Sequence, residues 1–121
     1  MTDQPQPAPP LDEGVLASLR GLADPDGPDL LAELVELFMT DAPPRLAGIA
    51  QAVASSDAEA LRRCAHALKG ASGTLGARRL ADVCGALEAA GRAGTTEGVD
   101  LAALHSEYES VRDALWAVAH G

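Results

Sequence analysis

A histidine, a lysine and two glycines recur at helical spacing in the stretch "HALKGASGTLG", residues 66–76. Imidazole is a nucleophile near neutral pH, and Lys69 follows His66 by one helical turn. Its ammonium would offset the negative charge of a phosphoryl group on the ring. Gly70 and Gly73 keep side chains away from the same face, although glycine weakens a helix by roughly 0.5–1 kcal/mol relative to alanine. The pattern H-x-x-K-G-x-x-G therefore predicts a phosphoryl-accepting histidine that another protein can approach.

A helical wheel at about 100° per residue places His66 opposite the apolar stripe. The stripe consists of Leu61, Cys64, Leu68, Ala71 and Leu75. The polar side holds Arg62, His66, Lys69, Gly70 and Gly73. This phase argues against a core histidine, and a merely solvated histidine would leave the two glycines unexplained. His105 and His120 have no such Lys-Gly context, and no base is arranged beside Ser72 or Thr74.

The elements that position this face are predicted to be helices, so the fold class is all-α. The chain has one Phe, one Tyr and one Trp, and its apolar residues are mostly Leu, Ala and Val, which favours helices over strands. Four long amphipathic segments with short connections predict an antiparallel up-down four-helix bundle. A short extra helix from about residue 12 precedes them. Residues 1–10 are predicted to be a disordered tail, and 11–121 form one domain.

The boundaries of these helices follow from local signals. The apolar stripe keeps its phase across Pro43-Pro44, which predicts one long kinked helix over 28–55, with Pro28 in its first turn after the loop "ADPDGPD". Ser56 and Glu59 form a capping box that starts the histidine helix, and Gly76 ends it after about Leu75. The next helix covers about 77–92 and the last about 98–119, with "GRAGTTEG" as the connecting loop.

Charge and composition exclude several classes of function. The formal net charge of −9 argues against nucleic acid and anionic membranes as partners and fits a protein that meets other proteins. No apolar run is long enough to span a bilayer, and "MTDQPQPAPP" is not a signal peptide, so we expect a cytoplasmic protein. Cys64 and Cys84 lack metal-ligand spacing and are expected to be reduced and buried. The chain also carries no Walker loop, kinase-type glycine loop or acidic Mg²⁺ cluster, and no metal site is expected.

At these residues the sequence resembles the histidine-containing phosphotransfer (HPt) domain of bacterial phosphorelays. The family's core motif matches "AHALKGASGTLGARRLADVCGALEAAGR", and the preceding helix and linker match "LLAELVELFMTDAPPRLAGIAQAVASSDAEALRRCAHALKG". The resemblance covers about residues 11–118 and implies a four-helix bundle that carries a phosphoryl group between aspartates of receiver domains. It further implies that Nε2 of His66 is phosphorylated, that Lys69 is the charge partner and that Gly70 provides clearance.

Glu88 is a further candidate on the next, antiparallel helix. The turn near Gly76 lies roughly midway between it and His66, so its carboxylate would sit level with the ring and accept a hydrogen bond from Nδ1–H. A glutamate does this at the matching place in the chemotaxis-kinase branch of the family. A solvated helix carboxylate is the open alternative. Arg62, Arg63 and Gly73 are expected in the docking face around His66, which the preceding helix borders.

The resemblance also implies how the work is divided between this chain and its partners. Response-regulator receiver domains and a hybrid histidine kinase are the expected partners, and the receiver would supply the aspartate, Mg²⁺ and a lysine. The chain would then be a monomeric phosphocarrier without a cofactor of its own, rather than an enzyme. Two alternatives stay open. One is the phosphoacceptor domain of a chemotaxis-type kinase, which ranks lower because no further domain follows "AVAHG". The other is a receiver-binding scaffold without phosphotransfer, which intact His66 and Lys69 argue against.

Overall fold

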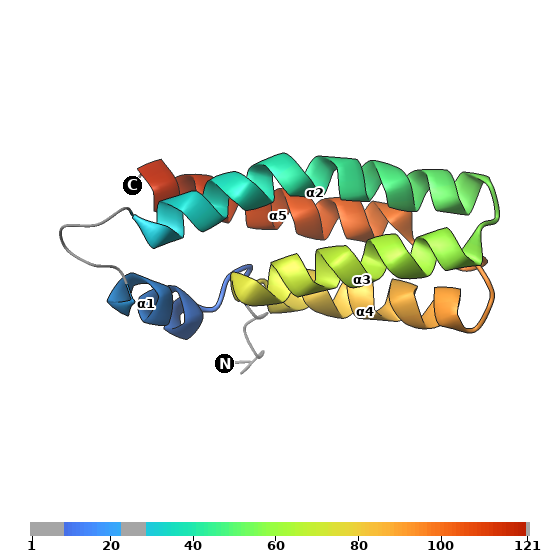
Figure 1. Cartoon of the computed structure of the whole chain (residues 1–121), viewed down its shortest axis with the longest axis horizontal. Coiled ribbons are helices and arrows are strands. Elements are labelled where there is room, and N and C mark those ends of the chain that lie inside the picture. The colour runs from blue at the N-terminus through green and yellow to red at the C-terminus, as the bar shows by residue number, and fades with distance from the viewer. Residues whose placement is uncertain (1–8, 23–28, 121) are drawn as a thin grey trace, which may run out of the picture.

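The computed structural model describes residues 9–22 and 29–120, and these residues form five helices (Figure 1). The helices are α1 (Glu13–Gly21), α2 (Leu30–Ala54), α3 (Ala58–Thr74), α4 (Arg78–Arg92) and α5 (Leu101–His120). The four long helices lie side by side, and α1 lies at the end of the bundle that holds the α3–α4 turn. The prediction of an all-α four-helix bundle with a short extra helix is confirmed. The predicted tail falls largely outside the described residues.

The second helix begins later than predicted but runs through its prolines. It starts at Leu30, where Asp29 is the N-cap and accepts a hydrogen bond from the backbone N–H of Ala32 at 3.1 Å. Most of the loop "ADPDGPD", including Pro28, lies outside the described residues. Pro43 and Pro44 are exposed and interrupt neither the helix nor its buried stripe of Leu31, Val35, Phe38, Ala42, Leu46, Ile49 and Ala52. One continuous helix is confirmed, and the kink stays a prediction.

The capping box predicted at the start of α3 is wrong. Asp57 is the N-cap, and its carboxylate accepts a hydrogen bond from the backbone N–H of Ala60 at 3.0 Å. Ser56 instead adopts a positive φ of 53° in the tight connection from α2, so it cannot take the extended conformation of an N-cap residue. Glu59 is consequently free of the capping role and pairs with Arg62.

The turn between α3 and α4 ends the histidine helix as predicted. Gly76 has a φ of 74°, which favours glycine, and the backbone N–H of Ala77 donates to the carbonyl of Ser72 at 2.9 Å. A Cβ at Gly76 would lie 2.9 Å from Cβ of Asp12. The Asp12 backbone N–H donates to the Gly76 carbonyl at 2.8 Å, and its carboxylate pairs with Arg78 at 2.7 Å. The residue that caps α1 therefore also fastens that helix to the α3–α4 turn.

The last helix starts at Leu101 rather than about residue 98. Gly98 has a φ of 75°, which a right-handed helix does not allow, and Asp100 accepts a hydrogen bond from the backbone N–H of Ala103 at 2.9 Å. Within the bundle, α3 packs against both α2 and α4, and α5 closes the other side. The fully buried side chains include Leu61, Leu68, Leu80, Leu104 and Leu115.

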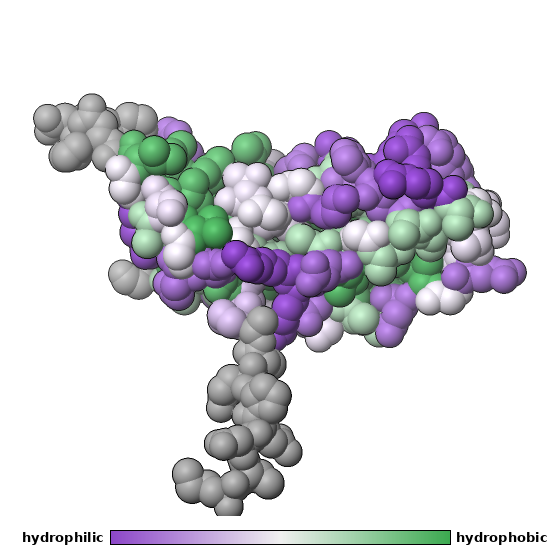
Figure 2. Space-filling view, turned by 90° about the horizontal axis from the view of Figure 1, so that it is seen from below, coloured by the Kyte–Doolittle hydropathy of each residue, from purple (hydrophilic) through white to green (hydrophobic). Residues whose placement is uncertain are grey.

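Both cysteines are free thiols, as predicted, but only one is fully buried. Cys84 lies in the core, where burial raises the pKa of its thiol to about 12. Cys64 is half-buried beside α2, and its Sγ would lie 2.8 Å from a Cβ at Gly48. Seen from below, the surface mixes hydrophilic and hydrophobic residues, with hydrophobic ones gathered toward the α1 end (Figure 2). Among the described helices, none is long and apolar enough to cross a membrane.

Candidate functional site

His66 lies in the middle of α3 and faces away from the core. Its side chain is 66% exposed, whereas Ala65 and Leu68 on the same helix are completely buried. The exposure predicted from the helical wheel is therefore confirmed. Because the ring is held on a helix rather than on a loop, its backbone is rigid and only the side-chain rotamer needs to be set.

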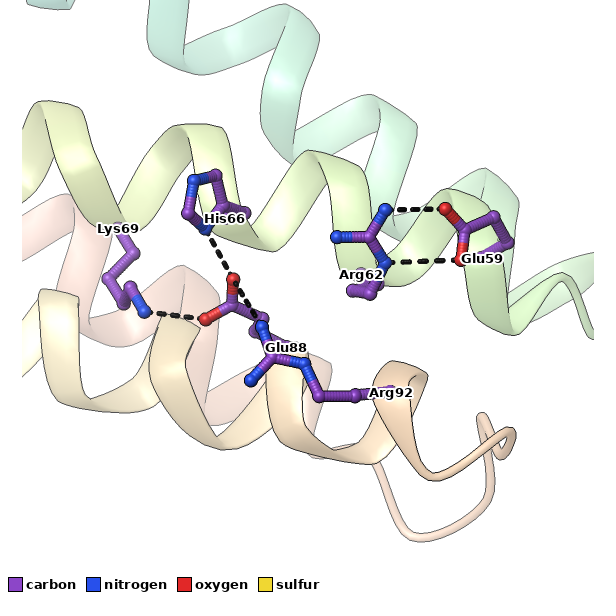
Figure 3. A network of polar contacts seen from close by, with 6 residues as sticks. All are labelled: Glu59, Arg62, His66, Lys69, Glu88 and Arg92. Carbon is purple, nitrogen blue, oxygen red and sulfur yellow. Dashed lines mark hydrogen bonds and ion pairs between the residues drawn. The ribbon is translucent and has the colours of Figure 1, made fainter.

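Glu88 sets the orientation of that ring. It belongs to α4, its side chain is only 5% exposed, and its Oε2 is hydrogen-bonded to Nδ1 of His66 (Figure 3). An ionised carboxylate only accepts hydrogen bonds, so Nδ1 carries the proton and donates it. The neutral imidazole then has its lone pair on Nε2, and the second ring nitrogen points away from α4 in Figure 3. The alternative of a solvated carboxylate is excluded by this burial and contact.

The carboxylate of Glu88 stays ionised despite its burial. A hydrogen bond from Lys69, with Nζ 2.5 Å from Oε1, is the main cause that lowers the pKa of Glu88 to about 2, and the contact with His66 acts in the same direction. Burial alone would raise that pKa. Arg92 adds a third contact, with its guanidinium 3.7 Å from Oε2. Glu88 is thus a negative centre surrounded by three nitrogen-bearing side chains.

Lys69 lies beside His66 as predicted, but its ammonium is bound to Glu88 in this structure. Its side chain is 39% exposed, so part of it remains open to solvent. The sequence predicted a cation next to the ring and did not predict that a carboxylate would already hold it. Its role toward a phosphoryl group stays a prediction.

The glycines of α3 and α4 do two different things. A Cβ at Gly70 or Gly73 would have no atom within 4 Å, so both positions open the surface near His66. A Cβ at Gly91 would lie 2.6 Å from the carbonyl oxygen of Ala58 and 2.7 Å from the backbone nitrogen of Arg62. The absence of a side chain at Gly91 therefore lets α4 approach α3 closely enough for the Glu88 contact. This requirement was not found in the sequence, where Gly91 fell at the end of the predicted helix 77–92 and at the start of the predicted loop "GRAGTTEG".

Positive charge is concentrated on the two helices that carry the site. Residues 58–92 contain six Lys and Arg against three Asp and Glu, while the rest of the chain contains three against fifteen. Arg62 donates two hydrogen bonds to Glu59, at 2.5 and 3.1 Å, which lower the pKa of that carboxyl. Arg63 is exposed. The predicted docking residues are thus on the surface of α3, and their contact with a partner stays a prediction.

An apolar groove runs between α2 and the C-terminal half of α3. It has a volume of about 330 Å³, and Leu37 at its rim is 63% exposed. The groove is lined by Leu34, Leu37, Phe38, Asp41, Ala71, Thr74 and Leu75. The lining includes Ala71 and Thr74, which follow Gly70 and Gly73 directly along α3.

The remaining nucleophiles are not part of this site. Ser72 is buried and donates to the carbonyl of Leu68 at 2.7 Å, and Thr74 donates to the carbonyl of Gly70 at 3.1 Å. His105 is exposed on α5, a helix that lies away from the His66 face, and the side chain of His120 is outside the described residues. In the part of the chain that the structure describes, no three His, Cys, Asp or Glu side chains are grouped to hold a metal.

Comparison with known proteins identifies the family. The Hpt domain model matches residues 33–114, which include the whole His66 site. The chain belongs to the Hpt domain family. This Hpt domain is similar to the crystal structure of histidine-containing phosphotransfer protein B from Pseudomonas aeruginosa PAO1, with 33% identity and a TM-score of 0.84 over 93% of this chain and 96% of that one.

A second solved structure extends the likeness to plants. The histidine-containing phosphotransfer protein MtHPt2 from Medicago truncatula shares 27% identity with this Hpt domain, with a TM-score of 0.76 over 90% of this chain and 76% of that one. The comparison with curated protein sequences finds no match. The family resemblance stated from the sequence is confirmed by the family model and by both structures.

Proposed function

We propose that this Hpt domain is a phosphocarrier of a phosphorelay, which accepts a phosphoryl group on Nε2 of His66 and passes it on between aspartates of receiver domains. The observation that carries the proposal is the contact between Nδ1 of His66 and the buried Glu88, which leaves Nε2 as the free nitrogen of an exposed ring. Membership of the Hpt family supports the same chemistry.

The transfer step follows from this tautomer. The Nε2 lone pair attacks the phosphorus of an aspartyl phosphate, an N–P bond forms, and the P–O bond to the aspartate breaks with its electrons on the carboxylate. Nδ1 keeps its proton throughout, so the ring gains positive charge as the bond forms. Glu88, already ionised and hydrogen-bonded to Nδ1–H, stabilises that charge without rearranging. The reverse step returns the phosphoryl group to the aspartate of the next receiver.

The other half of the chemistry belongs to the partner in this proposal. Phosphoryl transfer depends mainly on positioning and on neutralising charge on the phosphoryl oxygens. We assign the aspartate, Mg²⁺ and a lysine to the receiver, and the nucleophile, its orientation and nearby cations to this chain. In this proposal the chain acts as a carrier rather than as a kinase. We expect it in the cytoplasm with these partners, and we expect it to be a monomer.

The docking face is proposed to be the exposed side of α3 around His66 together with the bordering surface of α2. Open surface at Gly70 and Gly73 leaves room for the partner's loops, and the groove at Leu37 offers apolar contact beside them. The excess of Lys and Arg over 58–92 would attract the acidic receiver site, whereas the acidic remainder would repel it. We propose receiver domains and a hybrid histidine kinase as the partners that dock on this face.

The experiment is a phosphotransfer profile with a matched control. The protein, the His66→Gln variant and the His105→Gln variant are incubated with each phosphorylated receiver of the source organism, and loss of label from the receiver is followed over seconds. We expect transfer by the wild type and by His105→Gln, none by His66→Gln, and a label that is lost in acid and kept in base. Unchanged labelling of His66→Gln would overturn the proposal. Binding without labelling would favour the scaffold, and phosphorylation only by an ATP-binding kinase domain would favour the kinase phosphoacceptor.

A further inference from the structure

Arg92 is the contact of Glu88 that neither the sequence pattern nor the proposed transfer step uses. It follows Glu88 by one helical turn on α4, and its Nη2 lies 3.7 Å from Oε2. That oxygen is the one hydrogen-bonded to His66, whereas Lys69 occupies the other oxygen, Oε1 (Figure 3). Arg92 and His66 therefore meet at the same carboxylate oxygen.

The close approach of the two helices holds Arg92 in this place. Gly91, the preceding residue, packs against the backbone of Ala58 and Arg62 so closely that a Cβ would lie 2.6 Å from the nearest atom. The backbone of α4 at Arg92 is consequently fixed against α3. The Arg92 side chain itself is 69% exposed, so it can move without disturbing the core.

A second cation near Glu88 matters once a phosphoryl group is bound to His66. In the free protein the carboxylate is balanced by Lys69 and approached by Arg92. A phosphoryl group on Nε2 brings about −1.5 to −2 charges at neutral pH, and the ammonium of Lys69 is the neighbouring cation that it attracts. If Lys69 turns to the phosphoryl group, the nearly buried carboxylate loses its hydrogen-bonded cation just when it must stabilise the ring. A buried carboxylate without a paired cation is strongly disfavoured.

We propose that Arg92 is a positioning residue that keeps Glu88 paired and hydrogen-bonded to Nδ1–H of His66 when the phosphoryl group draws Lys69 away. The inference rests on the proposed function, because it concerns the same histidine. Two cations on one carboxylate then have separate tasks. Lys69 serves the phosphoryl group, and Arg92 replaces it on Glu88.

The test uses a small phosphoryl donor, so that partner docking does not enter the result. Acceptance of a phosphoryl group from phosphoramidate is measured for the wild type, Arg92→Gln, Arg92→Lys and the control Arg112→Gln, an exposed arginine on α5 that pairs with Asp113. We expect Arg92→Gln to slow acceptance about twofold to fivefold, the range of a partly exposed ion pair. Arg92→Lys should restore most of the rate, and Arg112→Gln should match the wild type.

A second readout separates positioning from a structural role. Nitrogen-15 NMR of the imidazole reports whether Nδ1 carries the proton before and after phosphorylation. In the free protein Arg92→Gln should keep the wild-type tautomer, because Lys69 still pairs with Glu88. In Arg92→Gln the Nδ1–H hydrogen bond should weaken only after phosphorylation. In the double variant Arg92→Gln, Lys69→Ala, that hydrogen bond should be weak in the free protein as well.

Several results would overturn the inference. Acceptance by Arg92→Gln at the wild-type rate would do so, as would slowing seen only with a receiver, which would make Arg92 a docking residue. A defect that Arg92→Lys fails to repair would indicate a different role. If Arg92→Gln does not fold, Arg92→Met provides the same comparison. Absence of any label on His66 in the wild type would instead contradict the proposed function, so the two failures are distinguishable.

Discussion

Glu88 on α4 holds Nδ1 of His66 on α3, across 22 positions of the chain. The two helices bring together a side chain that is 66% exposed and one that is 5% exposed, so the ring meets solvent while its partner does not. Because the Glu88 carboxylate is nearly buried and hydrogen-bonded to both His66 and Lys69, its position is fixed. This contact leaves Nε2 as the nitrogen of His66 without a protein partner on the exposed ring, which is the nitrogen that we propose reacts.

Lys69→Ala should slow transfer from a receiver without abolishing it. The variant removes the cation that we propose for the phosphoryl group and also the 2.5 Å hydrogen bond to Glu88, leaving Arg92 to pair with that carboxylate. For a partly exposed pair we expect a loss of about twofold to fivefold, and smaller at high salt, where charges are screened. Rapid-quench rates at low and high salt measure this. Lys69→Arg should keep most of the rate, and equal rates for Lys69→Ala and wild type in low salt would contradict the electrostatic role.

Gly70→Gln should leave the bundle folded and slow transfer to a partner. A Cβ at Gly70 meets no atom within 4 Å, and glycine is the poorer helix former, so stability should be unchanged or rise by up to about 1 kcal/mol. The longer side chain would occupy the open surface on which we propose that a receiver docks. Thermal unfolding and receiver transfer are measured together. Acceptance from phosphoramidate should be affected less than transfer from a receiver. If Gly70→Gln accepts from a receiver at the wild-type rate, Gly70 has no clearance role.

Gly91→Ala should destabilise the fold, and Gly85→Ala on the same helix is its control. A Cβ at Gly91 would lie 2.6 Å from the Ala58 carbonyl oxygen, and backbone atoms cannot move aside, so α3 and α4 would have to separate. We expect a loss of about 1–3 kcal/mol in the free energy of unfolding. A Cβ at Gly85 meets only Cδ of Lys69 at 3.7 Å, an ordinary contact. Urea unfolding of both variants measures this loss. Equal stabilities of Gly91→Ala and Gly85→Ala would contradict the close approach of α4 to α3.

The stability that Glu88 contributes should depend on pH in a defined window. The hydrogen bond from Lys69 lowers the pKa of Glu88 from its ordinary value of 4.5 to about 2 in the folded protein. A depressed folded-state pKa means that the contribution is complete above pH 4.5 and disappears as the pH falls through about 2. The stability difference between wild type and Glu88→Gln should therefore shrink as the pH falls from about 4.5 toward 2.

Unfolding by urea at a series of pH values measures that difference. The control is Glu109→Gln, because Glu109 is exposed on α5. Its difference from wild type should not shrink in the same window. A Glu88→Gln difference that stays constant down to about pH 2 would show that Glu88 is not held by Lys69 and His66 in solution.

The sequence was sufficient for the parts of this protein that depend on local order along the chain. Helical periodicity identified the four long helices, the continuity of α2 across Pro43-Pro44 and the exposed position of His66. Gly76 was predicted to end α3, and the structure shows a φ of 74° there, which favours glycine. The start of α3 was assigned wrongly, since Ser56 and Asp57 both suit an N-cap and only the geometry of the α2–α3 connection selects between them.

The tertiary structure alone decided how the site is assembled. Sequence spacing made Glu88 a candidate, but its burial, its ionised state and its hold on both His66 and Lys69 depend on the distance between two helices. That distance is set by Gly91, whose missing side chain admits the backbone of α3, and it also brings Arg92 to the same carboxylate. Periodicity records which way a residue faces on its own helix, whereas a contact between helices depends on how closely their backbones pack.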